Sequence, residues 1–231
     1  MKIYDILIKN GTIMDPANNI NSKLDIAISN KKIAKVSKSI DESISKQTID
    51  AKDLIVCPGL IDIHAHSFGY WEAIFPDEMC LPFGTTTMLD AGGPGWKTFD
   101  RMKDDVIRRS KTRVFSLLNI VGSGMVMDGE QNLSDMDSEA TAAKINERRD
   151  MLVGVKVAHF EANSWEAIKR GKKAAEDSGT FMMVDQNPIS GRNMKELLGN
   201  YMTSGDILTH VYAWGKPILD RNKKVYDYFF D

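Results

Sequence analysis

The chain has 231 residues, 42% of them hydrophobic, which is enough apolar content for a sizeable buried core. Its 30 basic and 32 acidic residues nearly cancel and form no long block of one sign, so composition gives no support for binding to nucleic acid or to an anionic membrane surface. We therefore expect a small-molecule partner, and we leave a homo-oligomer open.

The N-terminal segment does not resemble a signal peptide, because Lys2, Asp5 and Lys9 interrupt its first apolar run. No later stretch reaches the roughly 18 apolar residues of a membrane-spanning helix. The two cysteines, Cys57 and Cys80, lie far apart in the sequence, which disfavours a disulfide framework. These features predict a cytoplasmic protein with free thiols.

Residues 2–50 alternate short apolar runs with turns, which predicts a small β module. The expected turns are Asn10-Gly11 and residues 30–32. The expected strands are residues 3–8, 12–14, 25–28 and 33–36. We assign residues 1–54 to this module, as part of a small β-sandwich.

After Pro58-Gly59 the pattern changes to apolar strands alternating with helices, which is typical of βαβ units around a parallel sheet. The expected strands are residues 60–64, 86–90, 114–120, 153–157, 181–185 and 206–211. The expected helices are residues 98–109, 138–150, 165–177 and 194–202. The third helix has Asn163 or Ser164 as its predicted N-cap and Gly179 after its end.

These units predict an α/β fold of the TIM-like (β/α)8 type over residues 55–231. Such a barrel has eight strands and typically needs about 250 residues. About six βα units are present, so we expect an incomplete barrel whose last strands lie beyond Asp231.

Two histidines end the first strand of this region, in residues 58–66, PGLIDIHAH. Strand side chains alternate between faces, so His64 and His66 project to the same side, where two imidazoles can bind one metal ion. The position also fits, because catalytic groups of such barrels lie at the C-terminal ends of the strands. Taken alone, this spacing is a weak signal and favours two ordinary polar histidines over a metal site.

The opening strand-turn-strand module precedes this motif, and three further segments follow it in a characteristic order: residues 84–92, GTTTMLDAG; residues 154–159, GVKVAH; and residues 205–210, GDILTH. With the first motif, the order and spacing of these segments resemble the amidohydrolase superfamily. The similarity is to the branch that contains dihydroorotases, D-aminoacylase-like enzymes and amidohydrolase/deacetylase metallohydrolases.

The resemblance implies a centre of two divalent metal ions, with zinc expected. It makes His64, His66 and His210 ligands, and it makes Lys156 the residue that CO2 converts to a bridging carbamate. Asp185 departs from the family pattern, since many members have a histidine there, but a carboxylate oxygen also binds Zn²⁺. Lys156 is alternatively an ordinary surface lysine, although it lies in the apolar run 152–158, where an unpaired lysine is costly.

Two further residues have expected roles near the metals. His159 follows Lys156 closely, and four readings stay open: a substrate contact, an oxyanion donor, a replacement ligand or a simple loop histidine. Asp90 ends the second strand, and we expect it to orient a ligand histidine through a hydrogen bond.

The implied activity is hydrolysis of an amide, cyclic amide or acyl ester by a metal-bound hydroxide, with an N-acyl or O-acyl substrate favoured. In the family a general-base aspartate ends the last strand, and none of Asp220, Asp227 and Asp231 has a matching apolar context. We therefore assign no catalytic base, and we expect the missing strands to impair turnover. The alternative is a non-catalytic scaffold of the same fold, or an inactive fragment.

Overall fold

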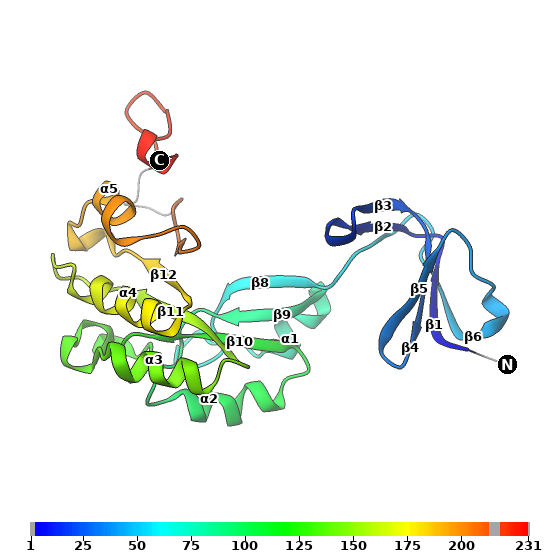
Figure 1. The fold of residues 1–231 in the computed structure, drawn as a ribbon, viewed down its shortest axis with the longest axis horizontal. Helices are drawn as coiled ribbons and strands as arrows, with labels where there is room; N and C mark the ends of the chain where they lie inside the picture. The colour runs from blue at the N-terminus through cyan, green and yellow to red at the C-terminus, as the bar shows by residue number, and fades with distance from the viewer. Residues whose placement is uncertain (1–2, 213–217, 231) are drawn as a thin grey trace. The chain divides into compact units, whose positions relative to one another are not determined.

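A computed structural model describes residues 3–212 and 218–230 of the chain (Figure 1). Contacts divide the chain into two units, Met1–Gly59 and Leu60–Asp231. The first unit extends beyond the expected residues 1–54, because strand β7 (Ile55–Val56) pairs in parallel with β2 (Thr12–Asp15). Each unit is described by itself.

The N-terminal unit contains two small sheets. One has the order β5-β4-β1-β6, and the other has the order β3-β2-β7. The remaining strands are β1 (Tyr4–Lys9), β3 (Ile20–Lys23), β4 (Asp25–Ser29), β5 (Lys32–Ser37) and β6 (Ser45–Asp50). All four strands predicted here are present, and β3, β6 and β7 were not anticipated. β6 escaped prediction because it is largely polar and lies at the edge of its sheet.

The second unit is built on a six-stranded, all-parallel sheet in which the strands follow one another in chain order, from β8 to β13. The strands are β8 (Leu60–Ala65), β9 (Thr85–Asp90), β10 (Arg113–Asn119), β11 (Leu152–Ala158), β12 (Phe181–Asp185) and β13 (Ile207–Leu208). The sheet curls into a half-barrel (Figure 1). The predicted parallel α/β architecture is confirmed, because all six expected units occur in the expected order.

Helices connect these strands. They are α1 (Pro76–Met79), α2 (Phe99–Asp105), α3 (Ser138–Glu147), α4 (Glu166–Ser178) and α5 (Met194–Glu196). A short 3-10 helix follows α2, and π-helical residues Leu197–Tyr201 follow α5, so these two predicted helices are each broken. Within the described part of the chain, none of the helices has the length and apolar character needed to cross a membrane.

α4 shows how the small residues of a helix allow close packing on the sheet. Its buried face includes Ala167, Gly171 and Ala175. A Cβ atom at Gly171 would lie 2.2 Å from Val157 Cγ2 on β11, so only glycine permits this approach. The helix ends at Gly179, as predicted, in the left-handed conformation with φ of 61°. Its N-cap is Trp165 and not Asn163 or Ser164, although the Ser164 hydroxyl accepts a hydrogen bond from the Glu166 backbone N–H.

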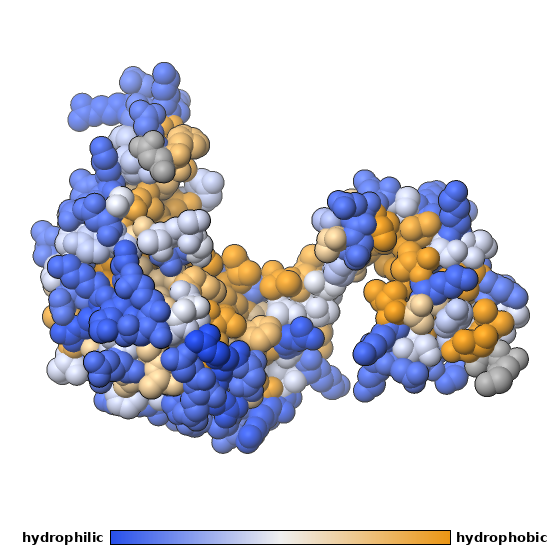
Figure 2. Space-filling model, in the orientation of Figure 1, coloured by the Kyte–Doolittle hydropathy of each residue, from blue (hydrophilic) through white to orange (hydrophobic). Residues whose placement is uncertain are grey.

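β8 ends the sheet on one side, and its apolar side chains are unusually exposed. Leu60, Ile61 and Ile63 keep 55%, 66% and 55% of their accessible surface. Figure 2 shows hydrophobic side chains gathered over β8 and β9 on the face in view. Among the described residues, β8 pairs only with β9.

Asp77, in the first turn of α1, connects this helix to the start of β10. Its carboxylate accepts hydrogen bonds from the backbone N–H groups of Lys111, at 2.9 Å, and Thr112, at 2.8 Å. These bonds hold the pKa of Asp77 below its usual value of 3.8, with the Thr112 bond the largest cause. The ionised form is therefore the one that stabilises the fold.

We expect Asp77→Asn to lower the free energy of unfolding by about 1 kcal/mol near pH 7, measured by urea denaturation. Because the folded pKa is depressed, this contribution is present above pH 3.8 and is lost as the pH falls below that value. The difference between wild type and variant should therefore shrink at acid pH. Asp104→Asn is the control, since Asp104 forms only an exposed ion pair with Arg108 and should cost less than about 0.5 kcal/mol. Equal losses in the two variants would contradict the assignment.

Candidate functional site

Three histidines come together at the C-terminal end of the sheet. His64 lies near the end of β8 and His66 directly follows the strand, and their ring centroids are 5.5 Å apart. The ring of His210, which follows β13, lies 4.8 Å from that of His64. Sequence positions about 145 residues apart are thus adjacent, because parallel strands place their carboxyl ends at one edge of the sheet.

The environment of the β8 histidines keeps them uncharged. Burial, followed by the positive charge of Lys156, lowers the pKa of both His64 and His66 to about 4. Both imidazoles are therefore neutral near pH 7, the form in which histidine binds metal ions. His66 Nδ1 is also buried without a hydrogen-bond partner in the protein. Such an atom has a lone pair or a proton available for a ligand.

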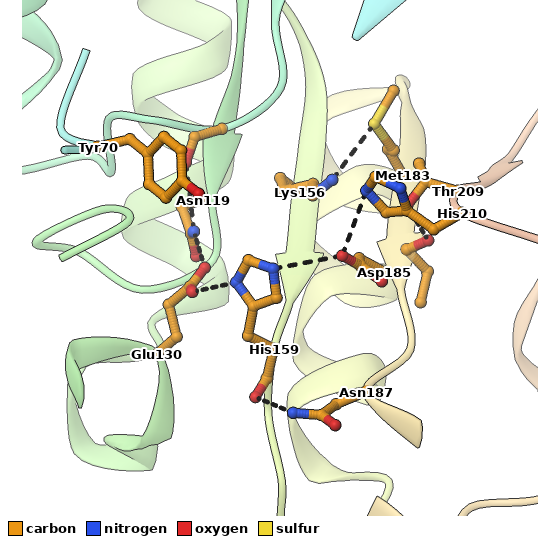
Figure 3. Close-up of polar contacts among 12 residues, drawn as sticks. Tyr70, Asn119, Glu130, Lys156, His159, Met183, Asp185, Asn187, Thr209 and His210 are labelled. Atoms are coloured by element: carbon orange, nitrogen blue, oxygen red, sulfur yellow. Dashed lines mark hydrogen bonds and ion pairs between the residues drawn. The ribbon is translucent and has the colours of Figure 1, made fainter. Parts of the chain in front are cut away.

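Lys156 lies within β11 and is one of the largest fully buried side chains, with 1% of its surface exposed. Its Nζ lies 3.6 Å from Met183 Sδ on the neighbouring strand β12 (Figure 3). Gly92, after β9, allows this placement, because a Cβ atom there would lie 2.4 Å from Lys156 Cβ. Lys156 is therefore not an ordinary surface lysine.

Asp185 ends β12 and is buried between two histidines. Its Oδ2 lies 3.3 Å from His159 Nε2 and 3.6 Å from His210 Nε2, and Figure 3 shows both rings directed toward the carboxylate. β13 was predicted to continue to residue 211 but ends at Leu208. The backbone N–H of Thr209 still bonds to Val184, and His210 then turns with φ of 55°.

His159 lies between two carboxylates, one of which the sequence did not reveal. Its Nδ1 is 2.6 Å from Glu130 Oε2, while its Nε2 faces Asp185. These two hydrogen bonds, with Asp185 the larger cause, raise the pKa of His159 to about 9. His159 is therefore protonated near pH 7 and donates through both nitrogens. Glu130 comes from a polar 3-10 turn, Met127–Gln131, whose sequence carries no periodic or motif signal.

Asp90 acts differently from the prediction. Its buried carboxylate accepts hydrogen bonds from the backbone N–H and hydroxyl of Ser67, at 2.6 and 2.9 Å, and from the Gly93 N–H at 2.7 Å. It thus fixes the backbone that follows His66 and the loop after β9, and it does not bond to an imidazole ring. Burial raises its pKa, while these bonds act in the opposite direction.

The donor set suits a divalent cation only if Lys156 takes part. Histidine, cysteine, aspartate and glutamate side chains in the described ranges form no group of three or more arranged to hold an ion. Neutral imidazoles and a carboxylate are nevertheless the ligand types that Zn²⁺ prefers. A lysine ammonium repels a cation, whereas a lysine carbamate supplies anionic oxygens at the centre of the group. With that modification the residues present fit a metal centre.

Two of the unassigned aspartates, Asp220 and Asp227, lie in a turn and at the start of a short helix. Asp220 accepts backbone hydrogen bonds from Asn222 and Lys224 in its own turn, and Asp227 begins a 3-10 helix. Asp231 lies outside the described residues. The geometry thus identifies no proton acceptor among the first two.

The chain is similar in sequence to known enzymes. No family model matches the chain. The chain is 31% identical over 230 residues to a deacetylase of Enterococcus faecalis, covering 94% of this chain and 59% of that protein. It is 43% identical over 200 residues to a dihydroorotase of Streptococcus thermophilus, covering 81% of this chain and 45% of that protein. The chain thus spans less than two thirds of the length of these relatives.

Solved structures give the same result. The crystal structure of an adenine deaminase superposes with a TM-score of 0.84 at 31% identity, over 99% of this chain and 62% of that one. The crystal structure of a dihydroorotase gives a TM-score of 0.81 at 26% identity, over 92% of this chain and 59% of that one. These similarities confirm the predicted resemblance to the amidohydrolase superfamily.

Proposed function

We propose that this chain carries the metal-binding half of a hydrolase that cleaves an amide, cyclic amide or acyl ester bond. The observation that supports this most strongly is the convergence of His64, His66 and His210 with buried Lys156 and Asp185 at one end of a parallel sheet. A scaffold protein has no need of five ligand-type residues at that place. Relatives in this superfamily are generally binuclear metal enzymes, which supports the same proposal.

In this proposal His64, His66, Asp185, His210 and carboxylated Lys156 hold two divalent cations, with zinc the best match to nitrogen and carboxylate donors. When bound, such cations lower the pKa of water and polarise a carbonyl oxygen. Carboxylation joins the Lys156 amine to CO2; starting from the ammonium form it releases two protons, so the residue changes from a cation to an anion. The negative charges of the carbamate and Asp185 offset part of the charge of the cations.

The remaining residues of the site bind and orient the substrate. His159 presents an N–H at Nε2 beside Asp185, and its side chain is 46% exposed, so a substrate oxygen has access to it. An N–H in this position stabilises negative charge that develops on a carbonyl oxygen during attack. Asp90 and Gly93 fix the backbone around His66, which limits the movement of that ligand.

The relatives suggest the substrate class. A deacetylase, a dihydroorotase and an adenine deaminase share hydrolytic attack on a carbon bonded to nitrogen or oxygen. We propose an N-acyl or O-acyl compound as the substrate, because the deacetylase of Enterococcus faecalis aligns with 94% of this chain.

Zinc binding and turnover test this proposal. We expect Zn²⁺ to raise the thermal unfolding midpoint of the wild-type chain, because a ligand that binds only the folded state stabilises it. His64→Asn/His66→Asn should abolish this shift and lower turnover of N-acetyl and O-acetyl substrates by at least about 100-fold. Metal content by mass spectrometry and a circular dichroism spectrum of the variant complete the comparison.

The outcomes separate the alternatives. A folded double variant that keeps its zinc and its turnover would remove the β8 histidines from the site. A wild-type chain that binds no zinc would reject the metal centre and favour the scaffold. Zinc binding without turnover of any acyl, amide or cyclic amide compound would reject hydrolysis by this chain.

A further inference from the structure

The turn after β10 holds His159 from two sides. Glu130 lies 2.6 Å from the Nδ1 atom of the ring. The next residue, Gln131, donates from Nε2 to the His159 carbonyl oxygen at 2.8 Å and accepts at Oε1 from the Glu161 N–H at 2.9 Å. Two adjacent side chains of one 3-10 turn thus fix both the imidazole and the backbone of a single residue.

This double attachment corresponds to an unusual backbone conformation. His159 has φ of 54°, in the left-handed region that costs a residue with a Cβ roughly 1–2 kcal/mol. A second amide, Asn187 Nδ2, also donates to its carbonyl at 3.3 Å. The surrounding side chains therefore determine the direction in which His159 leaves β11.

Glu130 is itself held in one orientation by Asn119, at the end of β10. Asn119 Nδ2 donates to Glu130 Oε1 at 2.7 Å and to the Gly92 carbonyl at 3.3 Å. Its Oδ1 accepts from the Val121 N–H at 3.1 Å, so the amide cannot be reversed without losing all three hydrogen bonds. One carboxylate oxygen of Glu130 thus accepts a hydrogen bond from Asn119, and the other faces His159 Nδ1 (Figure 3).

The burial of Glu130 and the exposure of His159 indicate which of the two side chains holds the other in place. Only 3% of the surface of Glu130 is exposed, whereas the His159 side chain is 46% exposed. Burying a carboxylate is costly unless hydrogen bonds compensate for lost water. An ion pair at the surface would not require a buried carboxylate. The buried Glu130 is therefore suited to hold the accessible His159 ring in one position.

We propose that Glu130 is a positioning residue that fixes the His159 imidazole with Nε2 directed at Asp185 and at the bound substrate. This role rests on the proposed hydrolytic function. The side chain of Glu130 bonds to His159 and Asn119, and we propose that it acts through His159. A carboxylate oxygen at Nδ1 only accepts, so this contact keeps a proton on Nδ1.

Glu130→Gln provides the test. The fixed N–H of Asn119 requires an acceptor, so the new amide must direct its oxygen there and its NH2 group at His159 Nδ1. That nitrogen then has to accept instead of donate. We expect kcat to fall about 10- to 100-fold, as for other residues that orient active-site groups, while KM and zinc content stay within about two-fold of wild type. Glu130→Asp should recover part of the loss because it keeps the carboxylate.

Glu161→Gln is the matched control. It makes the same chemical change in the same loop, at an exposed side chain, and should leave kcat unchanged. Glu130→Gln with wild-type kcat, or a loss of kcat equal to that in Glu161→Gln, would overturn the proposal.

A measurement without turnover separates this proposal from the hydrolase itself. Two-bond proton–nitrogen NMR spectra of the full wild-type chain report whether His159 Nδ1 carries a proton, with His159→Gln assigning the signals. We expect a protonated Nδ1 in wild type and an unprotonated Nδ1 in Glu130→Gln. A wild-type Nδ1 without a proton would overturn the role of Glu130 even if hydrolysis is observed or if the variant does not fold. The expected spectra with no hydrolysis would support the positioning and reject the enzymatic function.

Discussion

Lys156→Met is expected to leave the chain folded and at least as stable as the metal-free wild type, while it abolishes metal binding and hydrolysis. Methionine has nearly the length of the lysine stem and suits the buried position beside Met183. The substitution removes an amine that is costly to bury, so the free energy of unfolding should be unchanged or higher by about 1 kcal/mol. Active sites often show this opposition between stability and function.

The loss of function follows from the shape of the site. The described histidine and carboxylate side chains are not arranged to hold an ion by themselves. In the proposed metal centre, the Lys156 carbamate therefore completes the set of ligands. Without a carbamate we expect turnover to fall by at least about 100-fold, more than for a residue that only orients a ligand. Urea denaturation of the metal-free proteins measures stability, and metal analysis with turnover of the zinc-loaded proteins measures the loss of function.

Lys169→Met is the control for this prediction. Lys169 is exposed on α4, and its substitution should change stability by less than about 0.5 kcal/mol and leave metal content unchanged. If Lys156→Met keeps its metal and its turnover, Lys156 does not belong to the site. If it unfolds while Lys169→Met does not, the amine has a structural role instead.

Gly92→Ala is expected to destabilise the chain by about 3 kcal/mol and to weaken zinc binding. Gly92 has φ of 90°, which strains any residue with a Cβ by roughly 1–2 kcal/mol. The added Cβ would also lie 2.4 Å from Lys156 Cβ and 2.6 Å from its Cγ. Overpacking of a buried site typically adds about 1–3 kcal/mol, and the side chain that must move is the proposed metal ligand.

Gly84→Ala is the control that separates the backbone strain from the contact with Lys156. Gly84 has φ of 79°, but a Cβ atom there would meet nothing within 4 Å. This variant should show the backbone strain alone and bind zinc as the wild type does. The difference between the two alanine variants, measured by urea denaturation and zinc titration, then reports the contact with Lys156. Equal destabilisation and equal zinc affinity would mean that Gly92 does not determine where Lys156 lies.

Local sequence patterns were sufficient for the framework of the second unit. Continuous apolar runs separated by helical segments predicted six parallel strands, because strands buried on both faces need apolar residues at every position. The alternation of side chains along a strand also placed His64 and His66 on one side. The prediction that Lys156 is buried followed from the apolar residues around it in β11.

Prediction was weaker wherever an element is short or polar. β6 and β3 are mostly polar strands, so their sequences lack the alternation that identifies a half-buried strand. β13 is only two residues long, and the turn at His210 depends on backbone bonding to β12. These features arise from pairing with a neighbouring strand, which no local pattern encodes.

The sequence by itself therefore determined the resemblance to the amidohydrolase superfamily, the order of the strands and the residues that lie near their ends. Only the tertiary structure joined Glu130 to His159 across 29 positions and assigned Asp90 to the backbone after His66. The reason is physical: strand and helix periodicities record burial on a repeating surface, whereas a loop side chain acquires its partner only when distant segments meet. For that reason the ligand candidates were predictable, and the residue that positions His159 was not.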